Sequence, residues 1–158
     1  MDTSKKTLIV FSGDLDRALA AFIIATGAAA MGDEVTMFFT FWGLNILRKP
    51  HAPRHHKDLL QGMFGAIMPR GSLHLGLSTM NFWGLGPRMM RSVMRRHNVM
   101  SLEELMASAR EQGVKLIACK MSMDLLGFSE DELIDGLDYV GVATYLGEAD
   151  QASVNLFV

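Results

Sequence analysis

The chain contains one cysteine, Cys119, and the flanking sequence places it where an α/β protein carries out chemistry. A short apolar run from Val114 to Ala118 precedes it, and the residues after it indicate the start of a helix. A thiol between a strand and a helix N-terminus lies near unpaired backbone N–H groups, which favour the thiolate. Lys120 adds a positive charge. The alternative is that Cys119 is a small buried hydrophobic residue, the usual role of a free cysteine.

A single cysteine restricts the chemistry that this chain can perform. It excludes an intramolecular disulfide and a cysteine-rich zinc site, and it suits a reducing cytosol. No signal peptide is visible, because Lys5 and Lys6 are followed at once by a strand-like run without a small-residue cleavage site. We therefore expect a cytoplasmic protein in which any sulfur cycle on Cys119 uses a second molecule.

The segment Ser12-Gly13-Asp14 is a second candidate for a functional role. It lacks the glycines and the lysine of a phosphate-binding loop, so it does not predict a nucleotide site by motif. It is either a plain helix-capping turn or a group that supports the cysteine.

Histidines gather in the basic, proline-interrupted segment from Arg48 to Lys57. His51 and His55 are four residues apart and His56 follows, but Asp58 is the only acidic residue nearby. The segment is interpreted as a solvated basic loop, a metal site, or, through His55 and His56, a surface that recognises an anion or a partner. We predict no metal and no cofactor, and we interpret the methionine-rich stretches as adaptable packing.

Alternating strands and helices must position these residues. Residues 7–11 and 34–40 are apolar runs typical of buried parallel strands, and between them Leu15, Leu19 and Phe22 recur at helical spacing until Gly32. The region from Trp42 to Asn98 holds all four prolines and every histidine, with possible helices at 63–68 and 87–96. A connection this long in a compact domain is typical of a lid or an assembly surface.

The regular α/β pattern returns after the insert. Ser101 and Glu104 form a capping box for a helix that Gly113 ends. Strands are expected at 114–118, 139–142 and 153–158, the last at an edge, with a short helix capped by Ser129 and a helix at 143–150. We therefore predict one α/β domain over 1–158, with a doubly wound, mostly parallel sheet, helices on both faces and a long helical insert at 42–98.

The ligand site of such a sheet lies at the carboxyl ends of its strands. Four segments should meet there: Ser12-Gly13-Asp14, Phe41-Trp42-Gly43, Cys119-Lys120 and Ala143-Thr144-Tyr145.

Charge and hydropathy limit the partners. The formal net charge of −2 does not indicate a protein that binds nucleic acid. The stretch from Gly71 to Pro87 is nearly free of charge but rich in Gly, Ser, Thr and Asn, and it is too short to span a membrane. We interpret it as protein interface or core, with an interfacial membrane helix as the alternative.

Three stretches together resemble the DsrE/DsrF-like family, and in particular its DsrE-like sulfurtransferase, or peroxiredoxin-like, branch. They are Ile9 to Gly43, the segment Cys119-Lys120-Met121-Ser122-Met123-Asp124, which is similar to that branch's Cys-x-Met-Ser-Met-Asp signature, and the turn Gly141 to Tyr145. The resemblance covers nearly the whole chain, and the cysteine motif is its specific part.

The resemblance implies a flavodoxin-like fold, assembly as a trimer or hexamer, and a persulfide carried on Cys119. Sulfur donor and acceptor proteins or small thiols would be the partners. The residues expected to support the cysteine are Lys120, Ser122, Ser12, Gly13, Asp14 and Thr144. The long insert is larger than in compact sulfur-relay members. The alternative function is an oligomeric regulatory module that binds a small anion or nucleotide without using the thiol.

Overall fold

The computed structural model describes residues 4–52 and 58–158. Within these ranges, the strands are β1 (Lys5–Val10), β2 (Glu34–Phe39), β3 (Lys115–Cys119), β4 (Asp138–Val140) and β5 (Val154–Phe157). The α-helices are α1 (Leu15–Ala30), α2 (Leu59–Ile67), α3 (Leu85–Arg96), α4 (Leu102–Glu111), α5 (Lys120–Leu126) and α6 (Val142–Ala149). Short 3₁₀ helices are η1 (Phe41–Leu47), η2 (Ser72–His74), η3 (Phe82–Gly84) and η4 (Glu130–Glu132).

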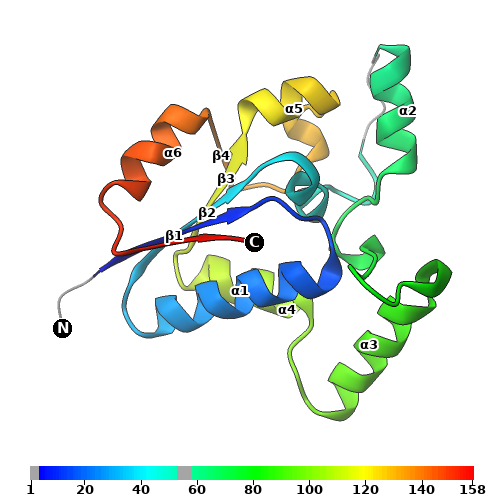
Figure 1. Ribbon diagram of the computed structural model, residues 1–158, viewed down its shortest axis with the longest axis horizontal. Helices are drawn as coiled ribbons and strands as arrows, with labels where there is room; N and C mark the ends of the chain where they lie inside the picture. The colour runs from blue at the N-terminus through cyan, green and yellow to red at the C-terminus, as the bar shows by residue number, and fades with distance from the viewer. Residues whose placement is uncertain (1–3, 53–57) are drawn as a thin grey trace.

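All strands of the sheet are parallel, in the order β4-β3-β2-β1-β5. Helices α1 and α4 cover one face of the sheet, and α5 and α6 lie on the other (Figure 1). In the strand register, Val10 pairs with Phe39 and Phe39 pairs with Ala118, so the carboxyl ends of β1, β2 and β3 lie side by side. The predicted doubly wound sheet, with β5 at an edge, is confirmed.

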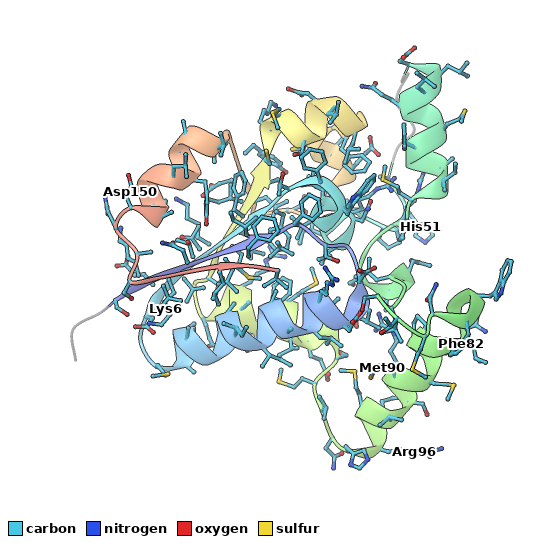
Figure 2. The ribbon with its side chains drawn as sticks, viewed as in Figure 1. Lys6, His51, Phe82, Met90, Arg96 and Asp150 are labelled. Carbon is cyan, nitrogen blue, oxygen red and sulfur yellow. The ribbon has the colours of Figure 1, made fainter. Side chains whose placement is uncertain are left out.

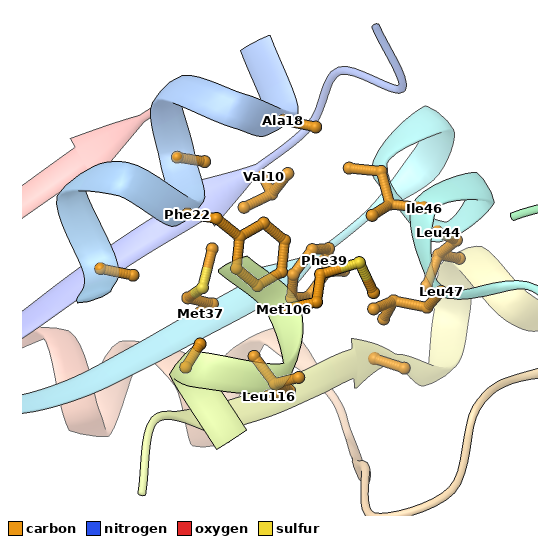
Figure 3. Close-up of a cluster of buried hydrophobic side chains, with 14 of the residues drawn as sticks. Val10, Ala18, Phe22, Met37, Phe39, Leu44, Ile46, Leu47, Met106 and Leu116 are labelled. Carbon is orange, nitrogen blue, oxygen red and sulfur yellow. The ribbon is translucent and has the colours of Figure 1, made fainter. Parts of the chain in front are cut away.

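The main core lies between the sheet and the pair α1 and α4. The rings of Phe22 from α1 and Phe39 from β2 have centroids 5.9 Å apart, and Met106 of α4 belongs to the same cluster (Figure 3). β2 is buried at every position after Glu34. An apolar strand without alternation is what a sheet covered on both faces requires.

The sequence did not predict η1, which follows β2 and closes one end of this core. Leu44, Ile46 and Leu47 point into the cluster around Phe39 (Figure 3). Gly43 makes the close approach possible, because a Cβ there would lie 2.0 Å from the carbonyl oxygen of Val10. The first residues of the predicted insert therefore belong to the core.

The other helices and strands are present where the sequence predicts them, but several begin or end at a different residue. The Ser101–Glu104 capping box is present, with the Ser101 Oγ accepting from the Glu104 N–H at 3.2 Å. The strand expected at 139–142 ends at Val140, because Gly141 already caps α6. The helix expected after Ser129 is a single 3₁₀ turn.

Both helices expected inside the insert are present, as α2 and α3, and both project from one end of the sheet (Figure 1). Gly65 is the one buried residue among those of α2. Among the described residues, no helix is long and apolar enough to cross a membrane.

Candidate functional site

Cys119 is the last residue of β3 and the residue that precedes α5. Side chains alternate along a strand, and Cys119 lies with Ile117 on the face that α6 covers. Together with Phe38 and Tyr145 these two residues form a second buried cluster, in which Cys119 is 2 % exposed. The thiol is therefore at the predicted place in the fold, but it is covered by protein within one chain.

Tyr145 makes the contacts that hold α6 over Cys119. Its ring stacks on Phe38 with centroids 4.7 Å apart, and its hydroxyl lies 3.1 Å from the Thr7 Oγ1. Thr7 in turn contacts Asn155 on β5. These contacts join α6 to β1, β2 and β5 directly over the face that carries Cys119.

Ser122 and Lys120 occupy the first turn of α5. The Ser122 hydroxyl is buried and lies 2.8 Å from the Thr40 Oγ1, so it ties α5 to the residue after β2. The Lys120 Nζ lies 3.2 Å from the Glu130 Oε1 at the surface. The contact of the Lys120 ammonium group is therefore with a surface carboxylate.

Ser12, Gly13 and Asp14 form a tight turn between β1 and α1. The Ser12 hydroxyl donates to the Asp14 Oδ2 at 2.9 Å and accepts from the Asp14 N–H at 3.1 Å. Asp14 occupies the N-cap position of α1 without capping it through its side chain. A Cβ on Gly13 would lie 2.6 Å from the carbonyl oxygen of Trp42, so glycine allows the two loops to touch.

The structure thus brings the four expected segments to one edge of the sheet, but in two groups. The first group joins Cys119 to the ends of β2 and α6, through Tyr145 and the Thr40–Ser122 contact. The second joins Ser12 to Asp14 with Trp42, at the end of β1. Since neighbouring strands are about 4.8 Å apart, β1 and β3 are separated by about 10 Å.

Thr144 and His51, two of the residues singled out in the sequence, do not belong to the buried cluster around Cys119. Thr144 is exposed on α6, one residue before Tyr145. His51 is exposed, and His55 and His56 lie outside the described residues. Over 4–52 and 58–158, no group of three or more His, Cys, Asp or Glu residues could hold a metal ion.

Arg48 was interpreted as part of a solvated loop, and this prediction is wrong. The side chain is 2 % exposed, and its guanidinium donates to the carbonyl oxygens of Gly65, Met68 and Pro69 at 3.2–3.3 Å. It also lies 4.5 Å from the centre of the Phe128 ring. Burial lowers the pKa of Arg48, the charge of Arg70 lowers it further, and the Glu132 carboxylate opposes both. Arg48 therefore anchors the insert from within.

Sequence reasoning also missed a pocket of about 600 Å³ beside the end of β1. Its walls come from the Ser12–Asp14 turn, from η1 and from the insert between Met68 and Arg91. Asn45 of η1 lines it, and so do Arg88 and Arg91 of α3. No local motif could have revealed it, because these residues meet only when the insert folds back on β1.

The fold and the site define a class: a small, doubly wound α/β protein with one cysteine at the carboxyl edge of its third strand. The sequence model of the DsrE/DsrF/DrsH-like family matches residues 3–157. The chain belongs to this family, as its cysteine motif indicated.

Two relatives extend over the full chain. It is 56 % identical over 156 residues to "Uncharacterized protein YrkE" of Bacillus subtilis, an alignment that covers 99 % of this chain and 98 % of that one. It is 38 % identical over 162 residues to "Sulfur carrier protein DsrE2" of Allochromatium vinosum, with all of both chains covered.

Solved structures confirm the fold. The MTH1491 protein of unknown function from Methanobacterium thermoautotrophicum matches with a TM-score of 0.57 at 14 % identity, covering 97 % of this chain and 98 % of that one. The ychN protein of E. coli matches with a TM-score of 0.55 at 12 % identity, covering 98 % of this chain and 99 % of that one. At these identities the likeness concerns the fold alone.

Proposed function

We propose that this protein is a cytoplasmic sulfur carrier, which holds a sulfur atom as a persulfide on Cys119 and passes it to a partner thiol. The observation that carries the proposal is the place of the sole cysteine at the end of β3. Membership of the DsrE/DsrF/DrsH-like family and full-length similarity to a protein named as a sulfur carrier support it.

The chemistry conserves atoms and electrons at each step. The Cys119 thiolate attacks the outer sulfur of a donor persulfide, the donor S–S bond breaks, and the donor leaves as a thiolate. With thiosulfate as donor, the leaving group is sulfite. An acceptor thiolate then attacks the outer sulfur of Cys119–S–S⁻ and Cys119 leaves as thiolate, so no net oxidation occurs. One cysteine is enough for this cycle because the second thiol belongs to another molecule.

The neighbouring residues have positioning roles in this proposal. Ser122 fixes the first turn of α5 through Thr40, 2.8 Å away. Lys120, the residue after Cys119, is proposed to supply a positive charge to the persulfide; in the isolated chain its Nζ lies 3.2 Å from the Glu130 Oε1 at the surface. Ser12, Gly13 and Asp14 set the neighbouring loop, and Thr144 lies on the exposed side of α6. His55 and His56 are proposed to recognise the partner.

Transfer requires the thiol to become accessible, because Cys119 is 2 % exposed. The cover is α6, a helix of eight residues in which Tyr145 is the buried residue. Local opening of a short element costs less than global unfolding, so displacement of α6 gives a donor access without loss of the sheet. We propose that a partner binds at α6 and exposes the thiol.

We also propose that the protein assembles with copies of itself through α2 and α5. Leu59, Leu60, Met63, Phe64 and Ile67 of α2 are each at least half exposed. Met121 and Leu125 of α5 are exposed too, and the Gln61 Nε2 joins the helices by donating to the Asp124 carbonyl oxygen at 3.0 Å. A run of exposed apolar side chains along a nine-residue helix and its neighbour is typical of an interface.

Sedimentation equilibrium tests the assembly. The chain should sediment as a trimer or hexamer, and the double variant Leu60→Asp with Phe64→Asp should shift it toward monomer. Ala107→Asp, at an exposed position of α4, is the control and should leave the assembly intact. A monodisperse monomer for the unaltered chain would contradict the proposal.

Mass spectrometry of the intact protein tests sulfur loading. Incubation with a persulfide donor should add one sulfur atom (about 32 Da) to the chain. Reduction should remove the adduct, and Cys119→Ser should not acquire it. An unaltered mass for the native chain, or an equal gain in the serine variant, would favour the binding module that leaves the thiol unused.

A further inference from the structure

The side-chain oxygen of Asn45 is buried and, in the described part of the chain, has no hydrogen-bond partner. The residue as a whole is 3 % exposed. Its backbone oxygen, in contrast, accepts from the Gly71 N–H at 3.0 Å. A buried carboxamide oxygen without a donor lowers the free energy of unfolding by about 1–3 kcal/mol. Such an atom in a folded protein therefore calls for an explanation.

The pocket that Asn45 lines supplies one. Its volume of about 600 Å³ is within the range of small-molecule sites. It lies at the carboxyl end of β1, beside the first turn of α1, where parallel α/β sheets bind ligands. Trp42, Leu75 and Leu77 give it apolar walls.

The charges that face the pocket favour an anion. Arg88 is exposed and forms no ion pair among the described residues, so its charge is available to a ligand. Arg91 is held by the Glu103 Oε2 at 3.1 Å and by the Ser72 carbonyl oxygen at 2.7 Å. Asp14, the acidic residue of the lining, lies 3.8 Å from the Arg17 Nε. His74 adds a ring whose Nδ1 is 2.9 Å from the Arg70 carbonyl oxygen.

We propose that this pocket binds a mononucleotide. The planar carboxamide of Asn45 offers one donor and one acceptor side by side, which matches the edge of a nucleobase. The apolar walls accommodate the faces of the base, and Arg88 binds the phosphate through a charge-assisted hydrogen bond. Cys119 does not line this pocket, so nucleotide binding and sulfur loading can be measured separately.

Isothermal titration calorimetry of the full chain with AMP, GMP, CMP and UMP tests the proposal. At least one nucleotide should bind, and more tightly than its nucleoside or inorganic phosphate. Asn45→Leu should weaken binding about 10-fold or more, because the base loses its polar contact. Arg88→Ala, an exposed position that does not endanger folding, should weaken it by a similar factor.

Two controls separate the pocket from the rest of the molecule. Arg96→Ala alters the far end of the same helix, as the label in Figure 2 shows, and should leave the affinity unchanged. Cys119→Ser should also bind normally, even if it no longer accepts sulfur. No binding by any of the four nucleotides would overturn the proposal. So would equal affinity for inorganic phosphate, or unchanged affinity in both pocket variants.

Discussion

Phe38 and Tyr145 stack with ring centroids 4.7 Å apart, and Cys119 lies in the same buried cluster. The stacking couples α6 to β2 over the thiol. Cys119, the candidate nucleophile, is therefore closed to solvent in the isolated chain, and Tyr145 of α6 forms part of its cover.

Shortening Tyr145 should expose the thiol. Tyr145→Ala removes the ring, costs about 3–5 kcal/mol of stability, and should raise the rate of Cys119 alkylation by iodoacetamide. Tyr145→Phe keeps the ring and loses only the contact with Thr7, so it should cost about 1 kcal/mol and leave the alkylation rate nearly unchanged.

Leu146→Ala is the matched control, since Leu146 is the next residue of α6 and is exposed. Its alkylation rate should equal that of the native chain. If all three variants react as fast as the native chain under native conditions, α6 does not gate the cysteine.

The hydrogen bond between Thr40 and Ser122 should couple the two residues energetically. Each of Ser122→Ala and Thr40→Val leaves one hydroxyl without its partner, 2.8 Å away in the native chain. The double variant should therefore cost less than the sum of the single variants, by about 1 kcal/mol. Urea unfolding of the four proteins measures this coupling, and strict additivity would show that the contact contributes nothing.

The buried guanidinium of Arg48 should not be replaceable by an ammonium group. Arg48→Lys keeps the charge, but one ammonium group cannot donate to the carbonyl oxygens of Gly65, Met68 and Pro69 together. We expect a loss of about 1–3 kcal/mol in urea unfolding. Arg96→Lys on the surface should have no measurable effect, and equal stability of the two variants would refute the anchoring role of Arg48.

Acid should weaken the contact of Asp33 with Lys6. The Lys6 Nζ lies 2.7 Å from the Asp33 Oδ2, and hydrogen bonds from Lys6 and then Ser4 lower the pKa of Asp33 below its ordinary 3.8. Because the folded-state pKa is the lower one, the stabilisation is complete above 3.8 and is lost as the pH falls through the folded-state value.

Thermal unfolding followed against pH measures this effect. Asp33→Asn should lower Tm at neutral pH and show a smaller further decrease below pH 3.8 than the native chain. Asp150→Asn, at the end of α6 and labelled in Figure 2, is the control and should follow the native curve. If Tm falls equally for the native chain and for Asp33→Asn as the pH is lowered, the Asp33–Lys6 contact does not stabilise the fold.

The local sequence pattern was sufficient to predict most of the helices and strands. Continuous apolar runs gave the parallel strands, and the Ser101–Glu104 pair gave the start of α4, because both depend on neighbours in the chain. The place of Cys119 at the end of β3 followed from the same pattern.

The remaining features depend on contacts between distant segments. Arg48, in a basic and proline-rich stretch, has the local pattern of an exposed loop, and only the packing of the insert buries it. Asn45 has no motif around it, and its pocket forms only when the insert returns to β1. Cys119 is buried in one cluster with Tyr145, which lies 26 residues further along the chain.

Discharge of sulfur from Cys119 to an acceptor thiol is the decisive test of the carrier role. The chain is loaded with a persulfide donor, freed of donor, and mixed with a small acceptor thiol, and the masses of protein and acceptor are followed together. We expect the native chain to lose one sulfur atom while the acceptor gains one persulfide sulfur, and we expect Cys119→Ser to transfer none. A loaded sulfur that stays on the native chain, or transfer that persists in the serine variant, would contradict a carrier role for Cys119.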